Sequence, residues 1–129
     1  MNNYIDKTVI IDKSVEIGTN VSIGPYSVIH PNVKIGDNTD IRSHCVIYPD
    51  TNIGSNNKIY DHVIIGSDPQ DLNFDVNKKT FVEIQENNII REHTSIHRST
   101  NENKPTKLYS NALIMANSHI GHDCIIGSN

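Results

Sequence analysis

The hydrophobic positions of this chain recur every six residues. Isoleucine occupies eleven successive positions at this spacing, from Ile5 to Ile65. From Ile5 to Ile59, the fourth residue after each isoleucine is small or β-branched, with Asn57 as the exception, and the residue directly after isoleucine is often glycine. This pattern does not follow the 3.6-residue period of an amphipathic helix. A six-residue unit with one large aliphatic and one small residue is typical of a parallel β-helix.

Each six-residue unit predicts one short strand and one corner. We expect isoleucine to point inward and the small residue to fit the crowded interior. Glycine after isoleucine is expected to turn the chain at the corner. Three units would close one triangular coil, and successive coils would stack at the usual strand spacing of about 4.8 Å. One coil cannot bury its hydrophobic face alone, so stability is expected to come from stacking.

The repeat is interrupted twice. It stops after Ile65, resumes at Ile84 one residue out of phase, stops again after Ile96, and resumes at Leu108. We therefore predict a single all-β domain over residues 1–129, with about six coils and two ejected loops near 67–82 and 101–107. Loops that leave a rigid solenoid usually carry function, and tolerated surface insertions are the alternative interpretation.

Composition narrows the function classes. The net charge of −4 argues against a nucleic-acid binder. No apolar run is long enough to span a membrane, and no secretion signal is evident, so a cytoplasmic location is expected. Cys45 and Cys124 both occupy the small inward position, which predicts core thiols in a reducing compartment rather than a disulfide or a metal pair.

Basic residues are concentrated in one stretch. Six of the eleven lysines and arginines lie between residues 78 and 107, in an otherwise acidic chain. This stretch can attract an anionic nucleotide or an acidic carrier protein, and a merely solvated face is the alternative.

Histidine is the residue type most able to carry chemistry here. Three histidines share the fourth position of their units and predict an exposed stack on a flat face: His44, His62 and His93. The pairs His93/His97 and His119/His122 have ligand-like spacings, but zinc requires three or four converging donors. We therefore predict no metal site. Zinc held between subunits, as in the gamma-class carbonic anhydrases, is the alternative.

The His122-Asp123 pair is the stronger catalytic candidate. Imidazole titrates near neutral pH and can act as a general base. A neighbouring carboxylate can fix the imidazole tautomer and stabilise the cation that forms when the base takes a proton.

Three motifs resemble one enzyme family. They are Pro69-Gln70-Asp71-Leu72, Thr94-Ser95-Ile96-His97-Arg98 and Asn117-Ser118-His119-Ile120-Gly121-His122-Asp123-Cys124. In this order and at this spacing they resemble the acyl-carrier-protein–UDP-N-acetylglucosamine O-acyltransferases, which begin lipid A synthesis. The resemblance covers essentially the whole chain and includes both interruptions of the repeat.

The resemblance implies a left-handed parallel β-helix, a homotrimer, and active sites in clefts between subunits. The 3-hydroxyl of UDP-N-acetylglucosamine would attack the thioester of a 3-hydroxyacyl carrier protein, with no cofactor. By resemblance, His122 is the general base and Asp123 the group that orients it. Four further residues match positions that line the substrate clefts: Gln70, Asp71, His97 and His119.

Two departures from the family pattern bear on this interpretation. The family often has lysine two residues after the loop aspartate, where this chain has Asn73, so that basic contact is either missing or supplied from the loop by Lys78 or Lys79. Some relatives acylate a 3-amino sugar, and Asn73 does not decide between the two acceptors.

The second departure is that the chain ends in mid-unit at Asn129. The resemblance implies further coils, an oxyanion N–H and a helical C-terminal domain that are absent here. We expect a fragment of a longer enzyme, with a short homologue that has lost its chemistry as the alternative. A non-catalytic trimeric β-helix that binds a sugar nucleotide remains the competing hypothesis for function.

Overall fold

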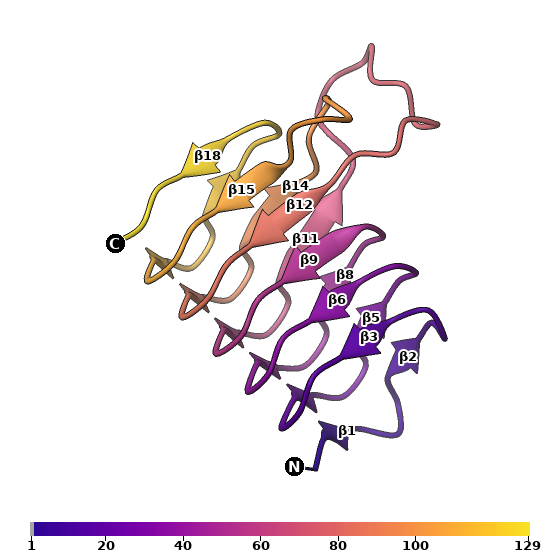
Figure 1. The fold of residues 1–129 in the computed structure, drawn as a ribbon, viewed down its shortest axis with the longest axis vertical. Helices are drawn as coiled ribbons and strands as arrows, with labels where there is room; N and C mark the ends of the chain where they lie inside the picture. The colour runs from indigo at the N-terminus through magenta and orange to yellow at the C-terminus, as the bar shows by residue number, and fades with distance from the viewer. Residues whose placement is uncertain (1) are drawn as a thin grey trace.

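A computed structural model describes residues 2–129 as a three-sided prism of six stacked coils (Figure 1). The predicted left-handed parallel β-helix is confirmed: the described residues form eighteen short strands and no helix. The first sheet contains β1 (Tyr4–Ile5), β4 (Ser22–Ile23), β7 (Asp40–Ile41), β10 (Lys58–Ile59), β13 (Ile89–Ile90) and β16 (Leu113–Ile114). The second contains β2 (Ile10–Ile11), β5 (Val28–Ile29), β8 (Val46–Ile47), β11 (Ile64–Ser67), β14 (Ser95–His97) and β17 (His119–Ile120). The third contains β3 (Glu16–Ile17), β6 (Lys34–Ile35), β9 (Thr51–Ile53), β12 (Val82–Ile84), β15 (Thr106–Leu108) and β18 (Ile125–Ile126).

The core is a stack of isoleucines. Ile23, Ile41 and Ile59 pair in register across β4, β7 and β10, and each is completely buried. The small inward position is also buried, so Thr39 and Val63 have almost no exposed surface. The six-residue pattern therefore predicted both layers of the interior correctly.

The corners turn by a different residue from the one that the pattern suggested. Fourteen of the described non-glycine residues have a positive φ, and all of them occupy the third position after the inward aliphatic residue. Most of them are Asn, Asp or His, the types that tolerate the left-handed conformation best. Of the seven glycines, only Gly66 has a positive φ (92°). The expectation that glycine turns the corner was wrong.

Glycine is needed instead for close approach between coils. A Cβ atom on Gly36 would lie 2.6 Å from the backbone carbon of Gly54 in the next coil, and one on Gly54 would lie 2.9 Å from the carbonyl oxygen of Gln85. Since backbone atoms cannot move aside cheaply, a side chain at these positions would push the coils apart.

The three stacked histidines are confirmed, with one correction to their place. The ring centroids of His44 and His62 lie 4.8 Å apart, and those of His62 and His93 lie 5.1 Å apart. All three residues have a positive φ and stand at a corner of the prism rather than on a flat face. Tyr26 continues the stack at 5.3 Å from His44.

The two cysteines have different environments. Cys45 is buried, and burial raises the pKa of its thiol to about 11. Cys124 is exposed, because it lies in the last described coil and no further coil covers it. The prediction of a core thiol is thus wrong for Cys124. Both cysteines are free.

Both interruptions of the repeat leave the prism at one edge. Residues 68–81 connect β11 to β12, and residues 98–105 connect β14 to β15 in the next coil. In each case the chain passes from the second sheet to the third, and the longer loop projects well beyond the prism (Figure 1). Within residues 2–129, no helix is long and apolar enough to cross a membrane.

Candidate functional site

Three of the sequence motifs meet at this edge in successive coils. The loop with Gln70 follows β11, the loop after His97 follows β14, and the corner with His122 follows β17. These strands are neighbours in the second sheet, so the residues that follow them lie above one another. The phase of the repeat places the motifs together although they are spread over more than fifty residues of sequence.

The His122 and Asp123 side chains contact each other directly. His122 Nδ1 lies 2.7 Å from Asp123 Oδ2. Since an ionised carboxylate only accepts hydrogen bonds, Nδ1 carries the proton and donates it. The other ring nitrogen, Nε2, is then the basic one, and the His122 side chain is about one third exposed. The arrangement leaves Nε2 of His122 as the ring nitrogen that can accept a proton, at a partly open corner.

Asp123 is held by the neighbouring loop. Its two carboxylate oxygens accept hydrogen bonds from the Thr100 backbone N–H at 2.9 Å and the Thr100 hydroxyl at 2.7 Å. Its own N–H donates to Thr106 Oγ1 at 2.9 Å. Asp123 also has a positive φ of 65°. Thr100 in the 98–105 loop therefore fixes the carboxylate that orients His122, and Thr106 at the start of β15 fixes the Asp123 backbone.

These bonds also set the charge of Asp123. Burial raises the pKa of this carboxyl, but hydrogen bonds from His122 and Thr100 outweigh burial and hold its pKa below the usual value. Asp123 is consequently ionised at neutral pH, as an orienting carboxylate must be.

His97 and His119 form a second pair in the same place. Their rings meet edge to face with centroids 4.5 Å apart. Burial is the main cause that lowers the pKa of His97, followed by the nearby His119 and His122, while Asp68 acts in the opposite direction. His119 Nδ1 lies 2.8 Å from the Ser95 hydroxyl, whereas the buried Nδ1 of His97 has no hydrogen-bond partner. Three histidines thus share one corner, with His97 favoured in its neutral form.

Gln70 and Asp71 lie on the exposed 68–81 loop. Asp71 stabilises the loop itself: its Oδ1 accepts the Asn73 N–H at 2.9 Å, and its carbonyl accepts the Phe74 N–H at 3.0 Å. Both residues are exposed at the edge that carries the histidines, and within residues 2–129 neither side chain forms a hydrogen bond with His122.

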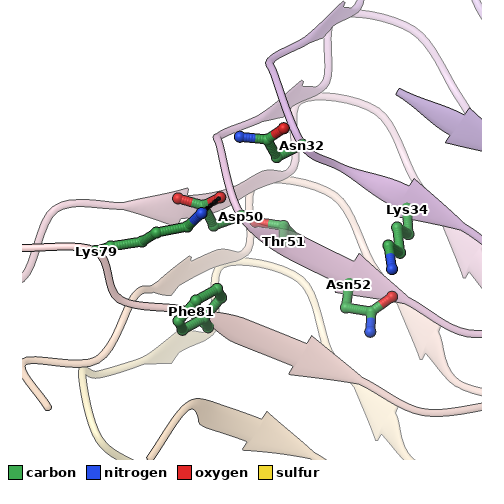
Figure 2. Close-up of a pocket in the computed structure, with 7 residues that line it drawn as sticks. All are labelled: Asn32, Lys34, Asp50, Thr51, Asn52, Lys79 and Phe81. Atoms are coloured by element: carbon green, nitrogen blue, oxygen red, sulfur yellow. Dashed lines mark ion pairs between the residues drawn. The ribbon is translucent and has the colours of Figure 1, made fainter. Parts of the chain in front are cut away.

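The basic stretch is largely neutralised within the chain. Lys79 and Arg98 both approach Asp50, at 3.8 and 3.5 Å. Arg91 pairs with Glu92, and Lys107 with Glu83. The Lys79 side chain extends toward Asp50 and remains largely exposed (Figure 2).

A cavity of about 310 Å³ lies beside this edge on the third sheet (Figure 2). Its lining includes the Asp50–Lys79 ion pair, the Phe81 ring and Asn52. Across residues 2–129, no group of three or more His, Cys, Asp or Glu side chains is arranged to hold a metal ion.

Sequence reasoning did not identify the residues that support the histidines. Thr100 and Thr106 bond to Asp123 from seventeen or more residues away, and Ser95 reaches His119 across twenty-four. The only available signal was the six-residue phase, which places Ser95 and His119 opposite each other on neighbouring strands.

Comparison with known proteins agrees with the six-residue repeat. The bacterial transferase hexapeptide family (six repeats) matches residues 14–49. No curated protein sequence matches the chain at a significant level.

Solved structures give wider matches. The UDP-N-acetylglucosamine O-acyltransferase (LpxA) of Moraxella catarrhalis RH4 is 41% identical with a TM-score of 0.90, covering 95% of this chain and 48% of that one. LpxA of Acinetobacter baumannii is 45% identical with a TM-score of 0.91, at 95% and 48% coverage. The UDP-N-acetylglucosamine acyltransferase of Francisella novicida is 40% identical with a TM-score of 0.92, at 95% and 45%. The chain therefore spans about half the length of these relatives.

Proposed function

We propose that this chain, which belongs to the hexapeptide-repeat acyltransferases and is similar to the UDP-N-acetylglucosamine O-acyltransferases, carries the general base of such an enzyme of the lipid A pathway. The observation that carries the proposal is the 2.7 Å contact between His122 Nδ1 and Asp123 Oδ2. That contact fixes the imidazole with its basic Nε2 free to accept a proton.

The reaction follows from this tautomer. Nε2 of His122 takes the proton of the sugar 3-hydroxyl while that oxygen attacks the thioester carbonyl carbon of a 3-hydroxyacyl carrier protein. The resulting tetrahedral intermediate collapses and breaks the carbon–sulfur bond. The imidazolium returns its proton to the departing sulfur, so the products are the 3-O-acyl sugar nucleotide and the free carrier thiol. The thioester is already activated, and this exchange uses no cofactor.

Asp123 supports the step electrostatically. The imidazolium that forms carries its new positive charge 2.7 Å from an ionised carboxylate. Because Thr100 donates two hydrogen bonds to the same carboxylate, Asp123 stays ionised and does not turn away. A positioned base of this kind contributes roughly 10²–10⁴ in rate.

The other residues at the edge are assigned to substrate binding. His97 and His119 line the corner beside His122, and Gln70 and Asp71 extend from the 68–81 loop toward the sugar nucleotide.

The apolar side chains of the 68–81 loop support the homotrimer proposed from the resemblance. Leu72 is fully exposed and Val76 is 71% exposed. Apolar groups of this size at a loop tip favour contact with a second copy of the chain.

The test is product formation from purified components. The chain is incubated with a 3-hydroxyacyl carrier protein and UDP-N-acetylglucosamine, and mass spectrometry follows the acylated sugar nucleotide and the carrier thiol together. The proposal predicts equal amounts of both. Binding of the sugar nucleotide with no acyl product would instead favour the non-catalytic hypothesis. Product only with a 3-amino sugar nucleotide would reassign the acceptor.

A further inference from the structure

Arg98 holds both ends of the loop that carries Gln70 and Asp71. Its backbone N–H donates to the carbonyl oxygen of Ser67 at 2.9 Å, where the loop leaves β11. Its guanidinium Nε donates to Thr80 Oγ1 at 2.9 Å, where the loop returns, and Nη2 donates to the Thr80 carbonyl oxygen. One residue therefore joins the departure and the return of the chain.

The surroundings of Arg98 make this anchorage rigid. The side chain is 11% exposed and lies 3.5 Å from Asp50, which is equally buried. Thr80 has no exposed surface. Figure 2 shows Asp50 facing Lys79, which adds a second, more exposed cation to the same carboxylate at 3.8 Å. Removal of the guanidinium would leave the buried oxygens of Thr80 without this donor, and Asp50 with the more exposed Lys79 as its cation.

The direction of the 68–81 loop depends on the Arg98 contacts at its two ends. In the part of the chain that the structure describes, the hydrogen bonds of residues 68–79 stay within the loop, as two turns around Asp71 and Asp75. The single ionic contact from this segment to the prism is that of Lys79 with Asp50. The loop is thus ordered by its own hydrogen bonds, and the attachment of its two ends to the prism sets its direction.

We infer that Arg98 is a positioning residue that sets the direction of the 68–81 loop, and with it the place of Gln70 and Asp71 at the edge that carries the histidines. The inference rests on the proposed function in assigning those two residues to sugar-nucleotide binding. The planar fork of arginine is required, because one side chain must donate to the Thr80 hydroxyl and carbonyl oxygens together and also reach Asp50. Lysine offers a single ammonium group and cannot reproduce that geometry.

The experiment compares Arg98→Gln and Arg98→Lys with Arg91→Gln as the matched control. Arg91 is a half-buried arginine at a different corner, where it pairs with Glu92 and lies over the Tyr60 ring. Amide exchange is measured at Ser99 and Thr106, whose N–H groups donate to the Phe81 carbonyl at the base of the loop. Loss of a hydrogen-bonded charge predicts exchange about tenfold faster in both Arg98 variants and unchanged in the control. Exchange in β10 serves as the internal reference for a folded prism.

The second readout is affinity for UDP-N-acetylglucosamine. We expect the dissociation constant to rise about tenfold in both Arg98 variants, with KM rising more than kcat falls, because other residues hold His122. Unchanged exchange, or faster exchange with wild-type affinity, would overturn the positioning role while the proposed function stands. Full rescue by lysine would overturn the requirement for the fork. A wild-type chain that binds no sugar nucleotide would contradict the proposed function, and the positioning role with it.

Discussion

Asp123→Asn replaces the carboxylate that orients His122 by an amide of the same shape. In the wild-type chain, one oxygen accepts the Thr100 N–H, and the other accepts the Thr100 hydroxyl and His122 Nδ1. The Thr100 backbone N–H can only donate, so the amide oxygen of asparagine is expected to stay opposite it. The amide nitrogen then faces His122 and donates to Nδ1, which moves the imidazole proton to Nε2.

The magnitude follows from this exchange of roles. An imidazole protonated on Nε2 cannot take the proton of the sugar hydroxyl, so transfer is expected to fall about 10²–10⁴-fold. The fold is expected to survive, because two hydrogen bonds are kept: that from the Thr100 N–H to the side-chain oxygen at position 123, and that from the backbone N–H of position 123 to Thr106 Oγ1. The loss should therefore appear as lower kcat rather than as unfolding.

The assay pairs turnover with nitrogen-15 chemical shifts of the His122 ring, which report the protonated nitrogen without any need for turnover. Asp61→Asn is the control, because the Asp61 carboxylate also accepts a hydrogen bond from a hydroxyl group, that of Ser43 at 2.7 Å, but at another edge of the prism. A proton that remains on Nδ1 of His122 in Asp123→Asn, or turnover within about threefold of wild type, would refute the reasoning.

Three further predictions concern the prism and its titratable groups. Gly36→Ala should lower the free energy of unfolding by about 1–3 kcal/mol in denaturant titrations, because its Cβ would meet backbone at 2.6 Å, whereas Gly127→Ala, with no atom within 4 Å, should be neutral. At pH 8, iodoacetamide should modify Cys124 and spare Cys45, as counted by mass spectrometry; equal labelling would contradict the buried thiol of raised pKa. The lowered pKa of His97 means that the unfolded chain binds a proton more readily, so its contribution to stability is complete above about pH 6.5 and is lost as pH falls toward the folded pKa. His97→Gln should therefore show a smaller drop in Tm between pH 7 and pH 5 than the wild-type chain. An equal drop in the two chains would contradict this contribution of His97 to stability.

The sequence was most informative about the interior. A strict six-residue period predicted the inward isoleucines, the parallel pairing and the number of coils, because only one stacking of such units buries every apolar position. It assigned the turn to glycine, whereas Asn, Asp or His residues with positive φ make it. In the sequence, these residues and the glycines needed for close approach both occur at the corners, so their two roles cannot be told apart. It also misjudged Cys124, whose inward position carries no burial without a covering coil.

The candidate site was only partly predictable. The adjacency of His122 and Asp123 suggested their pairing, but neighbouring side chains often point apart, and the contact depends on Thr100 in another coil. The same holds for Arg98, whose partners Asp50 and Thr80 are 48 and 18 residues away. Such contacts depend on the path of the ejected loops, which the repeat does not specify.

The central claim, that His122 is the base of an acyl transfer, is tested most directly by His122→Ala. Transfer from a 3-hydroxyacyl carrier protein to UDP-N-acetylglucosamine is measured for this chain and for the variant under identical conditions, with sugar-nucleotide affinity measured alongside. We predict that transfer in the variant falls by about 10²–10⁴ while the fold is retained and binding changes little. Equal turnover in the two chains would contradict the claim.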